Sequence, residues 1–361
     1  MADPAPDAAR HAARDPAAGG RGRLMAAEID EQPEALHRLL EDRPAIAAVA
    51  EAVARQRPRF VLFAGRGSSD HAALYAKYLC EIRLDLPCGL VSPSTLTAYQ
   101  ARPDLSGVLW VVVSQSGRSP DLVESTAAAA ARGALTVAVT NAPDSALAGA
   151  AALRIDVRAG HERAVAATKS YTSQLLALWL LVDAIRGGGG EPARALPDLA
   201  AGLLARPDAA EIASRYRFVE RLVTTGRGYS YPTAREAALK LMETSYLSAH
   251  AFSAADLMHG PLAMIDEDRP VIAVVPEGIG GRAMEPVLDR LHERGADLLV
   301  IGDVRAARGA AAVLPLPEGV PEDLSPVLQI LPLQRMAHAM AVARGYDPDA
   351  PRGLAKVTHT R

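Results

Sequence analysis

The chain has 361 residues, 49% of them hydrophobic, and a formal net charge of -3 at pH 7, which fits two domains with separate cores. Charges of both signs are interspersed and only 4% of the residues are aromatic, so the composition argues against a nucleic-acid partner and favours a small-molecule ligand. The sequence shows no secretory leader and no apolar run long enough for a membrane span, so we expect a cytoplasmic protein that is not membrane-bound. Cys80 and Cys88 are too few for a disulfide framework. We also expect that the protein needs no metal or organic cofactor.

Residues 1–24 are mostly Ala, Pro, Asp, Arg and Gly without apolar periodicity, which is typical of a disordered leader, and Met25 is an alternative start of the chain. Residues 25–56 show helical spacing of apolar side chains, with an interruption near Pro44. This pattern predicts two helices ahead of the first sheet.

Five apolar runs then alternate with helical patterns, which indicates a parallel sheet with helices on both faces. These runs are Phe60–Ala64, Gly89–Val91, Val108–Val113, Leu135–Val139 and Leu153–Val157. A helix over Thr168–Ile185 closes this first domain, which we place at 57–190 because Gly187–Gly190 is an evident break. Residues 191–210 are expected to form a linker with helical segments.

The segment 65–81, GRGSSDHAALYAKYLCE, returns in altered form at 226–243 as GRGYSYPTAREAALKLME. Each copy follows an apolar strand and turns into a helical pattern, so the sequence predicts a second, similar α/β domain at 211–350. Its strands are expected near 219–225, 270–275 and 297–301, and a long helix near 325–344 precedes a tail at 351–361.

Hydroxyl groups follow the predicted strands at the edge where open parallel sheets bind ligands. Ser114–Asp121 reads SQSGRSPD, in which Ser119 suits a helix N-cap and Pro120 the first helical turn. Gly67-Ser68-Ser69 and Ala167-Thr168-Lys169-Ser170 offer further hydroxyl and N–H groups to the same anion. Any one loop alone also fits an ordinary turn, but three at strand ends favour a phosphate site. No GxxxxGK[ST] motif is present and Asp70 replaces the third glycine of a dinucleotide fingerprint, so a sugar phosphate fits better than a nucleotide.

Candidate acid and base groups lie in the second copy. Glu236, Lys240 and Glu243 are spaced i, i+4, i+7 and share one helix face, which is either a solvated stripe or one wall of the site. His259 stands in a rigid Met-His-Gly-Pro turn that suits either an aimed imidazole or a structural histidine. Lys356 has uncharged, largely apolar neighbours, which would favour the neutral amine that a Schiff base requires, although a tail lysine is by default solvated.

The order of the motifs GSS, SQSG, VAATK, ExxxKLxE, HGPLA and AKVT resembles the double sugar-isomerase (SIS) module of glutamine-dependent fructose-6-phosphate aminotransferase across residues 28–361. The chain is still more similar to SIS-type glucosamine-6-phosphate deaminases in GRGSSDHA, SQSGRSPD, AVAATKSY and a terminal KVT. Either resemblance implies tandem SIS domains of a flavodoxin-like, doubly wound α/β fold, a homodimer, and binding of a phosphorylated amino sugar.

The resemblance also implies residue roles. Glu243 matches the base that shuttles a proton, His259 the ring-opening residue donated by the neighbouring subunit, and Lys356 the amine that contacts or condenses with the open-chain sugar; Glu236 and Lys240 match a supporting polar face. The implied phosphate-binding residues are Ser69, Ser114, Gln115, Ser116 and Ser119, supported by Gly67, Ser68, Val165, Ala167 and Thr168. Ala167 replaces a family serine, so it can contact the ligand only through its backbone.

The aminotransferases carry a glutaminase domain with a cysteine nucleophile ahead of this module, and neither is found in this sequence. We therefore expect the hydrolytic direction, in which glucosamine-6-phosphate is isomerised and releases ammonia to give fructose-6-phosphate. Four alternatives stay open: an aminotransferase component served by a separate glutaminase chain, a deglycase for a related sugar phosphate, an enzyme for the galactosamine epimer, and a non-catalytic phosphosugar sensor.

Overall fold

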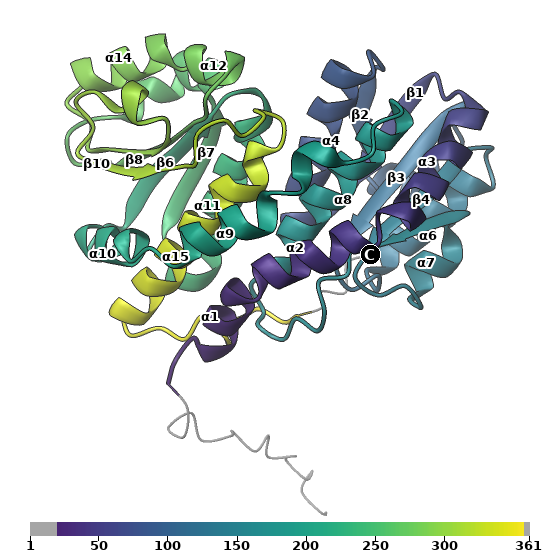
Figure 1. Cartoon of the computed structure of the whole chain (residues 1–361), viewed down its shortest axis with the longest axis horizontal. Helices are drawn as coiled ribbons and strands as arrows, with labels where there is room; N and C mark the ends of the chain where they lie inside the picture. The colour runs from purple at the N-terminus through teal and green to yellow at the C-terminus, as the bar shows by residue number, and fades with distance from the viewer. Residues whose placement is uncertain (1–19, 357–361) are drawn as a thin grey trace, which may run out of the picture.

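The structure is a computed structural model that describes residues 20–356. It contains two five-stranded sheets whose paired strands are all parallel, each flanked by helices (Figure 1). The first sheet has the order β2-β1-β3-β4-β5, formed by Phe60–Ala64 (β1), Cys88–Leu90 (β2), Val108–Ser114 (β3), Leu135–Thr140 (β4) and Leu153–Asp156 (β5). The tandem α/β fold predicted from the repeat is confirmed.

The second sheet repeats the first. Its order is β10-β9-β8-β6-β7, formed by Arg221–Gly226 (β6), Ser248–Ser253 (β7), Val271–Val275 (β8), Leu298–Gly302 (β9) and Ala312–Pro315 (β10). Read from the other edge, this is the order of the first sheet with each strand number raised by five. The sequence did not predict β7 and β10. Strand β7 alternates small, polar and aromatic residues and so gives no apolar run, and β10 has only 4 residues, the last of which is a proline.

Three helices precede the first sheet, where two were expected: Arg23–Asp30 (α1), Gln32–Glu41 (α2) and Arg43–Gln56 (α3). The helix break lies at Asp42, since Pro44 occupies the first turn of α3, where proline is tolerated. Helix α1 begins inside the segment that we expected to lie outside the fold, because the backbone N–H of Leu24 donates to the Asp349 carboxylate. Residues 1–19 lie outside the described residues, so the leader remains a prediction there.

The first sheet is covered on both faces. Helices Ser68–Arg83 (α4) and Lys169–Ile185 (α8) lie with α3 on one face, and Ser94–Thr97 (α5), Pro120–Ala130 (α6) and Ala146–Ala150 (α7) lie on the other. The helix expected at Thr168–Ile185 is thus confirmed within one residue. In the described chain, no helix combines the length and the apolar character that a membrane crossing requires.

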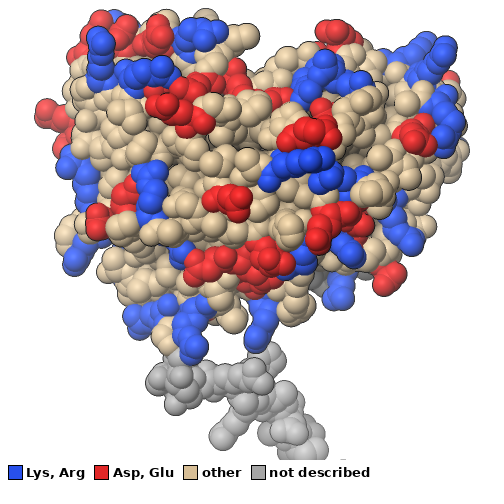
Figure 2. Space-filling view, viewed as in Figure 1, with Lys and Arg blue, Asp and Glu red and all other residues tan. Residues whose placement is uncertain are grey.

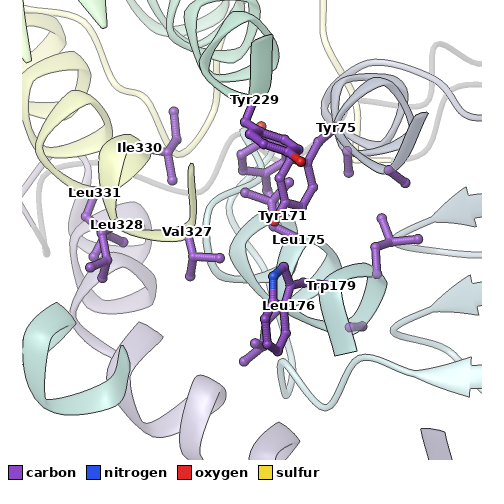
Figure 3. Packing of buried hydrophobic residues seen from close by; sticks show 14 of the residues in the cluster. Tyr75, Tyr171, Leu175, Leu176, Trp179, Tyr229, Val327, Leu328, Ile330 and Leu331 are labelled. Carbon is purple, nitrogen blue, oxygen red and sulfur yellow. The ribbon is translucent and has the colours of Figure 1, made fainter. Parts of the chain in front are cut away.

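The core of the first domain continues into the second. Helices Leu196–Leu204 (α9), Asp208–Arg215 (α10), Tyr231–Ser245 (α11) and Ser325–Ala343 (α15) join the two halves, and α11 packs against α4. Figure 3 shows Tyr75, Tyr171 and Tyr229 meeting above Trp179 at this junction. The Tyr75 and Tyr229 rings meet edge to face at 6.4 Å, so aromatic packing holds the turn after β6 against helix α4.

Charges of both signs intermingle over the two lobes visible in Figure 2. The face shown carries no broad basic patch of the kind that binds a nucleic-acid backbone.

Candidate active site

A cavity of about 200 Å³ lies at the carboxyl edge of the first sheet. Five stretches of chain, far apart in sequence, contribute to its wall: the turn after β1, the loop between β3 and α6, the loop before α8, the last turn of α11, and the C-terminal tail. The predicted residues that line it are Gly67, Ser68, Ser69, Ser114, Gln115, Ser116, Ser119, Val165, Ala167, Glu243 and Lys356. The structure therefore brings eleven of the fifteen candidate residues to one place; Thr168, Glu236, Lys240 and His259 are not among the lining residues.

The loop between β3 and α6 is shaped by its own hydroxyl groups. Ser114 Oγ accepts a hydrogen bond from the Gly117 N–H at 3.1 Å, and Ser116 Oγ accepts one from the Arg118 N–H at 3.3 Å. Ser119 is the N-cap of α6, as predicted, but its side chain does not cap the helix. The start of an α-helix carries free N–H groups and partial positive charge, so this loop can bind an anion with the Ser119 hydroxyl available.

The turn after β1 supplies the opposite wall. Gly67 has φ 55, a left-handed conformation that glycine adopts without strain, and a side chain at that position would point into open space. Ser69 Oγ is held by Gln174 Nε2 at 3.0 Å. The neighbouring Arg66 also lines the cavity and donates to the Asp121 carboxylate at 2.7 Å, so a guanidinium group stands at the site entrance. Our sequence analysis missed Arg66, although its place between two glycines at a strand end is a usable signal.

The charged face of α11 is not a solvated stripe. Lys240 is buried, and its Nζ lies 2.5 Å from Glu243 Oε2 and 3.4 Å from Glu236 Oε1. Glu236 is also buried and accepts hydrogen bonds from Ser68 Oγ and His71 Nδ1, each at 2.8 Å. Glu236 and Lys240 thus form a buried network behind Glu243, the member of the face that reaches the cavity. His71 was missed, because nothing in its local sequence points to a partner on α11.

Charged partners set the direction in which the pKa values of Glu236 and Lys240 are shifted. Burial alone would raise the pKa of Glu236, but the charge of Lys240 and the hydrogen bonds from His71 and Ser68 outweigh burial, and the net pKa is lowered. Burial opposes the charged form of Lys240, yet Glu243 and Glu236 raise its pKa above the ordinary value. The network therefore holds Lys240 as an ammonium beside Glu243.

Lys356 does not occupy the uncharged, apolar neighbourhood that its sequence neighbours suggested. Its Nζ lies 2.8 Å from Glu162 Oε2 and 2.6 Å from the carbonyl oxygen of Ala164. Glu162, which the sequence analysis missed, is buried and also accepts from the Ser170 hydroxyl and the Thr168 N–H. Burial favours protonation of Glu162, but the charge of Lys356 and these hydrogen bonds lower its pKa on balance.

Two predicted residues stand apart from the cavity. Thr168 is buried behind it and donates its backbone N–H to Glu162, so it shapes the loop and does not line the site. His259 ends the short helix Ala254–Met258 (α12) and is exposed in this single chain. Its expected role across a subunit boundary stays a prediction.

The equivalent place in the second domain is occupied by the chain itself. The turn between β8 and Ile279–Arg282 (α13) corresponds to the loop between β3 and α6, and there the Glu322 carboxylate accepts from the backbone N–H groups of Ile279 and Gly280, each at 2.7 Å. A carboxylate of the protein thus takes the N–H groups that an anionic ligand would otherwise use. The cavity beside this turn of the second domain is lined by residues such as Glu277, Arg282 and Asp303 and, among residues 20–356, by no serine.

Comparisons with known proteins agree with this architecture. The SIS domain model matches residues 56–184 and 217–344. Glutamine–fructose-6-phosphate aminotransferase (isomerizing) from Gloeobacter violaceus is 36% identical over 358 residues, which cover 92% of this chain and 58% of that protein. The chain therefore spans less than two thirds of the length of the curated relatives that it matches.

Several solved structures share the fold of this chain. A protein from Silicibacter pomeroyi, provisionally described as a phosphosugar isomerase, has a TM-score of 0.82 and 35% identity, covering 90% of this chain and 99% of its own. The C-terminal domain of glucosamine-fructose-6-phosphate aminotransferase from Francisella tularensis has a TM-score of 0.81 and 29% identity, with 91% and 98% covered. A glucosamine-6-phosphate deaminase from Thermotoga maritima has a TM-score of 0.72 at 22% identity over 93% of this chain and 100% of its own, which supports the shared fold alone.

Proposed function

The chain belongs to the SIS-domain family, and from that premise we propose that it is a phosphosugar isomerase that interconverts glucosamine-6-phosphate and fructose-6-phosphate. One observation carries the proposal: the carboxylate of Glu243 and the serine loops of the first domain line the same small cavity. When the serine loops hold the phosphate at C6 of the sugar, C1 and C2 at the opposite end of the sugar can lie against the Glu243 carboxylate.

Glu243 is the base in this proposal. It takes the proton from C2 of the open-chain amino sugar and returns it to C1, which converts the amino-aldose into a ketose imine. The Lys240 Nζ lies 2.5 Å from Glu243 Oε2 and so holds the carboxylate in place at the cavity. Water then adds to the imine at C2 and ammonia leaves, or ammonia adds in the reverse direction.

Lys356 contacts the open-chain sugar from the tail. Its Nζ is held by the Glu162 carboxylate at 2.8 Å and by the Ala164 carbonyl oxygen at 2.6 Å, a geometry that suits a hydrogen-bond donor to a sugar oxygen better than a nucleophile that must approach a carbonyl carbon. The ion pair therefore favours the contacting role over condensation with the sugar.

The direction of the reaction is the narrower part of the proposal. The curated relatives are named as aminotransferases, which favours a module that works with ammonia delivered to the ketose. The hydrolytic reading, a glucosamine-6-phosphate deaminase, uses the same residues and differs only in the fate of ammonia. Both readings include a homodimer in which His259 of one subunit assists ring opening in the other.

The first experiment supplies purified protein with glucosamine-6-phosphate in deuterated water, without glutamine, and measures ammonia, fructose-6-phosphate and deuterium incorporated at carbon. Ammonia with fructose-6-phosphate supports the deaminase. Deuterium incorporation without ammonia release supports the isomerase half of an aminotransferase, and glucosamine-6-phosphate made from fructose-6-phosphate and ammonium salt would confirm that direction. Binding of either sugar without exchange or turnover would contradict the proposal and indicate a sensor.

A further inference from the structure

A second cavity lies in the first domain, toward the end of the sheet opposite the serine loops. It has a volume of about 270 Å³ and is enclosed by α3, α4 and α8 on one face of the sheet. Its walls are hydrocarbon side chains such as Phe63, Leu109 and Leu181, together with the buried thiol of Cys80. Protein interiors leave few voids larger than a water molecule, so an apolar cavity of this size departs from ordinary packing.

One charged group stands at this cavity. Arg57 ends α3 in a left-handed conformation, is exposed, and lines the cavity. Among the described residues its guanidinium has no carboxylate within ion-pair distance, whereas Arg55, on the preceding turn, lies 3.8 Å from Glu51. The cavity therefore combines an apolar interior with an available cation at its rim.

We propose that this cavity binds a small carboxylate with an apolar tail, the tail inserted between α4 and α8 and the carboxylate paired with Arg57. An apolar cavity of ~150 Å³ holds benzene, and at roughly 30 Å³ for each carbon-sized group the larger cavity here takes about eight or nine such groups. An eight-carbon carboxylate such as octanoate fits that volume. The apolar tail supplies affinity, and the charge fixes orientation.

The elements around this cavity also reach the candidate active site. Helix α4 contributes Ala76 to the cavity and begins at Ser68 in the phosphate turn, and α8 contributes Ile185 and begins next to Thr168. Strand β3 contributes Leu109 and ends at Ser114. Helix α4 and strand β3 therefore contribute residues to both cavities.

Isothermal titration of the full chain with sodium octanoate tests the proposal, with butyrate and 1-octanol as companion ligands. Ala76 is buried against the cavity, so Ala76→Leu adds a side chain that occupies the space of the tail. We expect at least a tenfold loss of octanoate affinity in this variant, about two- to fivefold in Arg57→Gln, and none in the matched surface variant Arg55→Gln. Butyrate is expected to bind more weakly than octanoate.

Absence of octanoate binding, or unchanged affinity in Ala76→Leu, would overturn the site. Equal binding of octanoate and 1-octanol, or unchanged affinity in Arg57→Gln, would overturn the assignment of a carboxylate. The Arg57 change lies on the surface and keeps the test available if Ala76→Leu fails to fold. Retained phosphosugar binding by each variant confirms that the rest of the domain is intact.

Discussion

Lys356 Nζ lies 2.8 Å from the buried carboxylate of Glu162, a residue 194 positions earlier in the chain. Glu162 at the same time receives the backbone N–H groups of Thr168 and Ser170 at the start of α8. One carboxylate thus ties the C-terminal tail to the loop that carries Val165 and Ala167. The wall of the candidate site is completed by this long-range ion pair.

Replacing Glu162 with Gln is therefore expected to lower both stability and turnover. The amide cannot accept all of these hydrogen bonds, and unsatisfied buried groups cost about 1–3 kcal/mol each. The measurements are urea unfolding and glucosamine-6-phosphate turnover. The control is Glu31→Gln. It removes a carboxylate whose Oε2 lies 2.6 Å from Lys169 Nζ, and neither residue of this pair lines the cavity, so turnover should stay near the native value. Native turnover in Glu162→Gln would show that the tail needs no such anchor.

Glu243→Gln is expected to reduce turnover by a factor of about 10²–10⁴, the usual contribution of a positioned acid–base group, while phosphosugar binding persists. Binding is measured as ligand-induced thermal stabilisation. The matched control is Glu124→Gln on the exposed side of α6. Full activity in Glu243→Gln would refute its assignment as the base.

Ser119 offers a test of the phosphate site with little structural cost. Its hydroxyl does not cap α6, so Ser119→Ala should leave the free energy of unfolding nearly unchanged and weaken phosphosugar binding. The comparison is Ser145, whose Oγ accepts from the Ala148 N–H at 3.4 Å and caps α7. Ser145→Ala should lose about 0.5–2 kcal/mol of stability with unchanged phosphosugar affinity. Thermal unfolding without ligand measures the loss of stability, and the added stabilisation by the phosphosugar measures affinity. A Ser119→Ala variant that loses stability but keeps its phosphosugar affinity would argue against a phosphate at Ser119.

Subunit mixing tests His259. Chains carrying Glu243→Gln and chains carrying His259→Ala are each expected to be inactive, but a mixed dimer would hold one site with both native groups. Random mixing should therefore restore about one quarter of native turnover, as a two-fold symmetric dimer allows. No recovery after verified subunit exchange would place His259 within its own chain's site or outside the chemistry.

The sequence was sufficient for the parts of the fold and site that depend on local pattern. Strands such as β3 and β8 are buried on both faces and therefore appear as continuous apolar runs, whereas β7 at an edge carries His250 and gives no such run. The serine loops were predictable because ligands bind at the carboxyl ends of parallel strands. The helical period placed Glu236, Lys240 and Glu243 on one face of α11, but it could not show that Glu243 alone of the three lines the cavity.

The partners of these groups were not predictable, because they lie far away in the chain. His71 reaches Glu236 over 165 positions, and Glu162 reaches Lys356 over 194. Lys356 was interpreted from its apolar sequence neighbours, yet its environment is set by Glu162 from another loop. The interior of a protein, and not the adjacent sequence, decides whether a charged side chain is solvated or paired.

The buried Lys240 supplies the last prediction. Lys240→Met leaves the buried Glu236 without its strongest cationic partner, so we expect a loss of about 3–5 kcal/mol of unfolding free energy. The control Lys77→Met breaks a pair with Glu81 that lies near the surface, and should cost only about 0.3–0.5 kcal/mol.

The same variant should change the pH dependence of stability. The pKa of Lys240 is raised in the folded state, so its contribution is complete below the ordinary value of 10.5 and is lost as pH rises through the raised value. The pKa of Glu236 is lowered, so its contribution is present above 4.5 and is lost as pH falls through the lowered value. Without Lys240 the pKa of Glu236 rises in the variant, so the margin of the native protein over Lys240→Met should shrink as pH falls and Glu236 takes up a proton, and also as pH rises above 10.5 and Lys240 loses its proton. Urea unfolding across this pH range measures the difference in the free energy of unfolding between the two proteins. A difference that stays the same at every pH would show that Lys240 acts through packing alone.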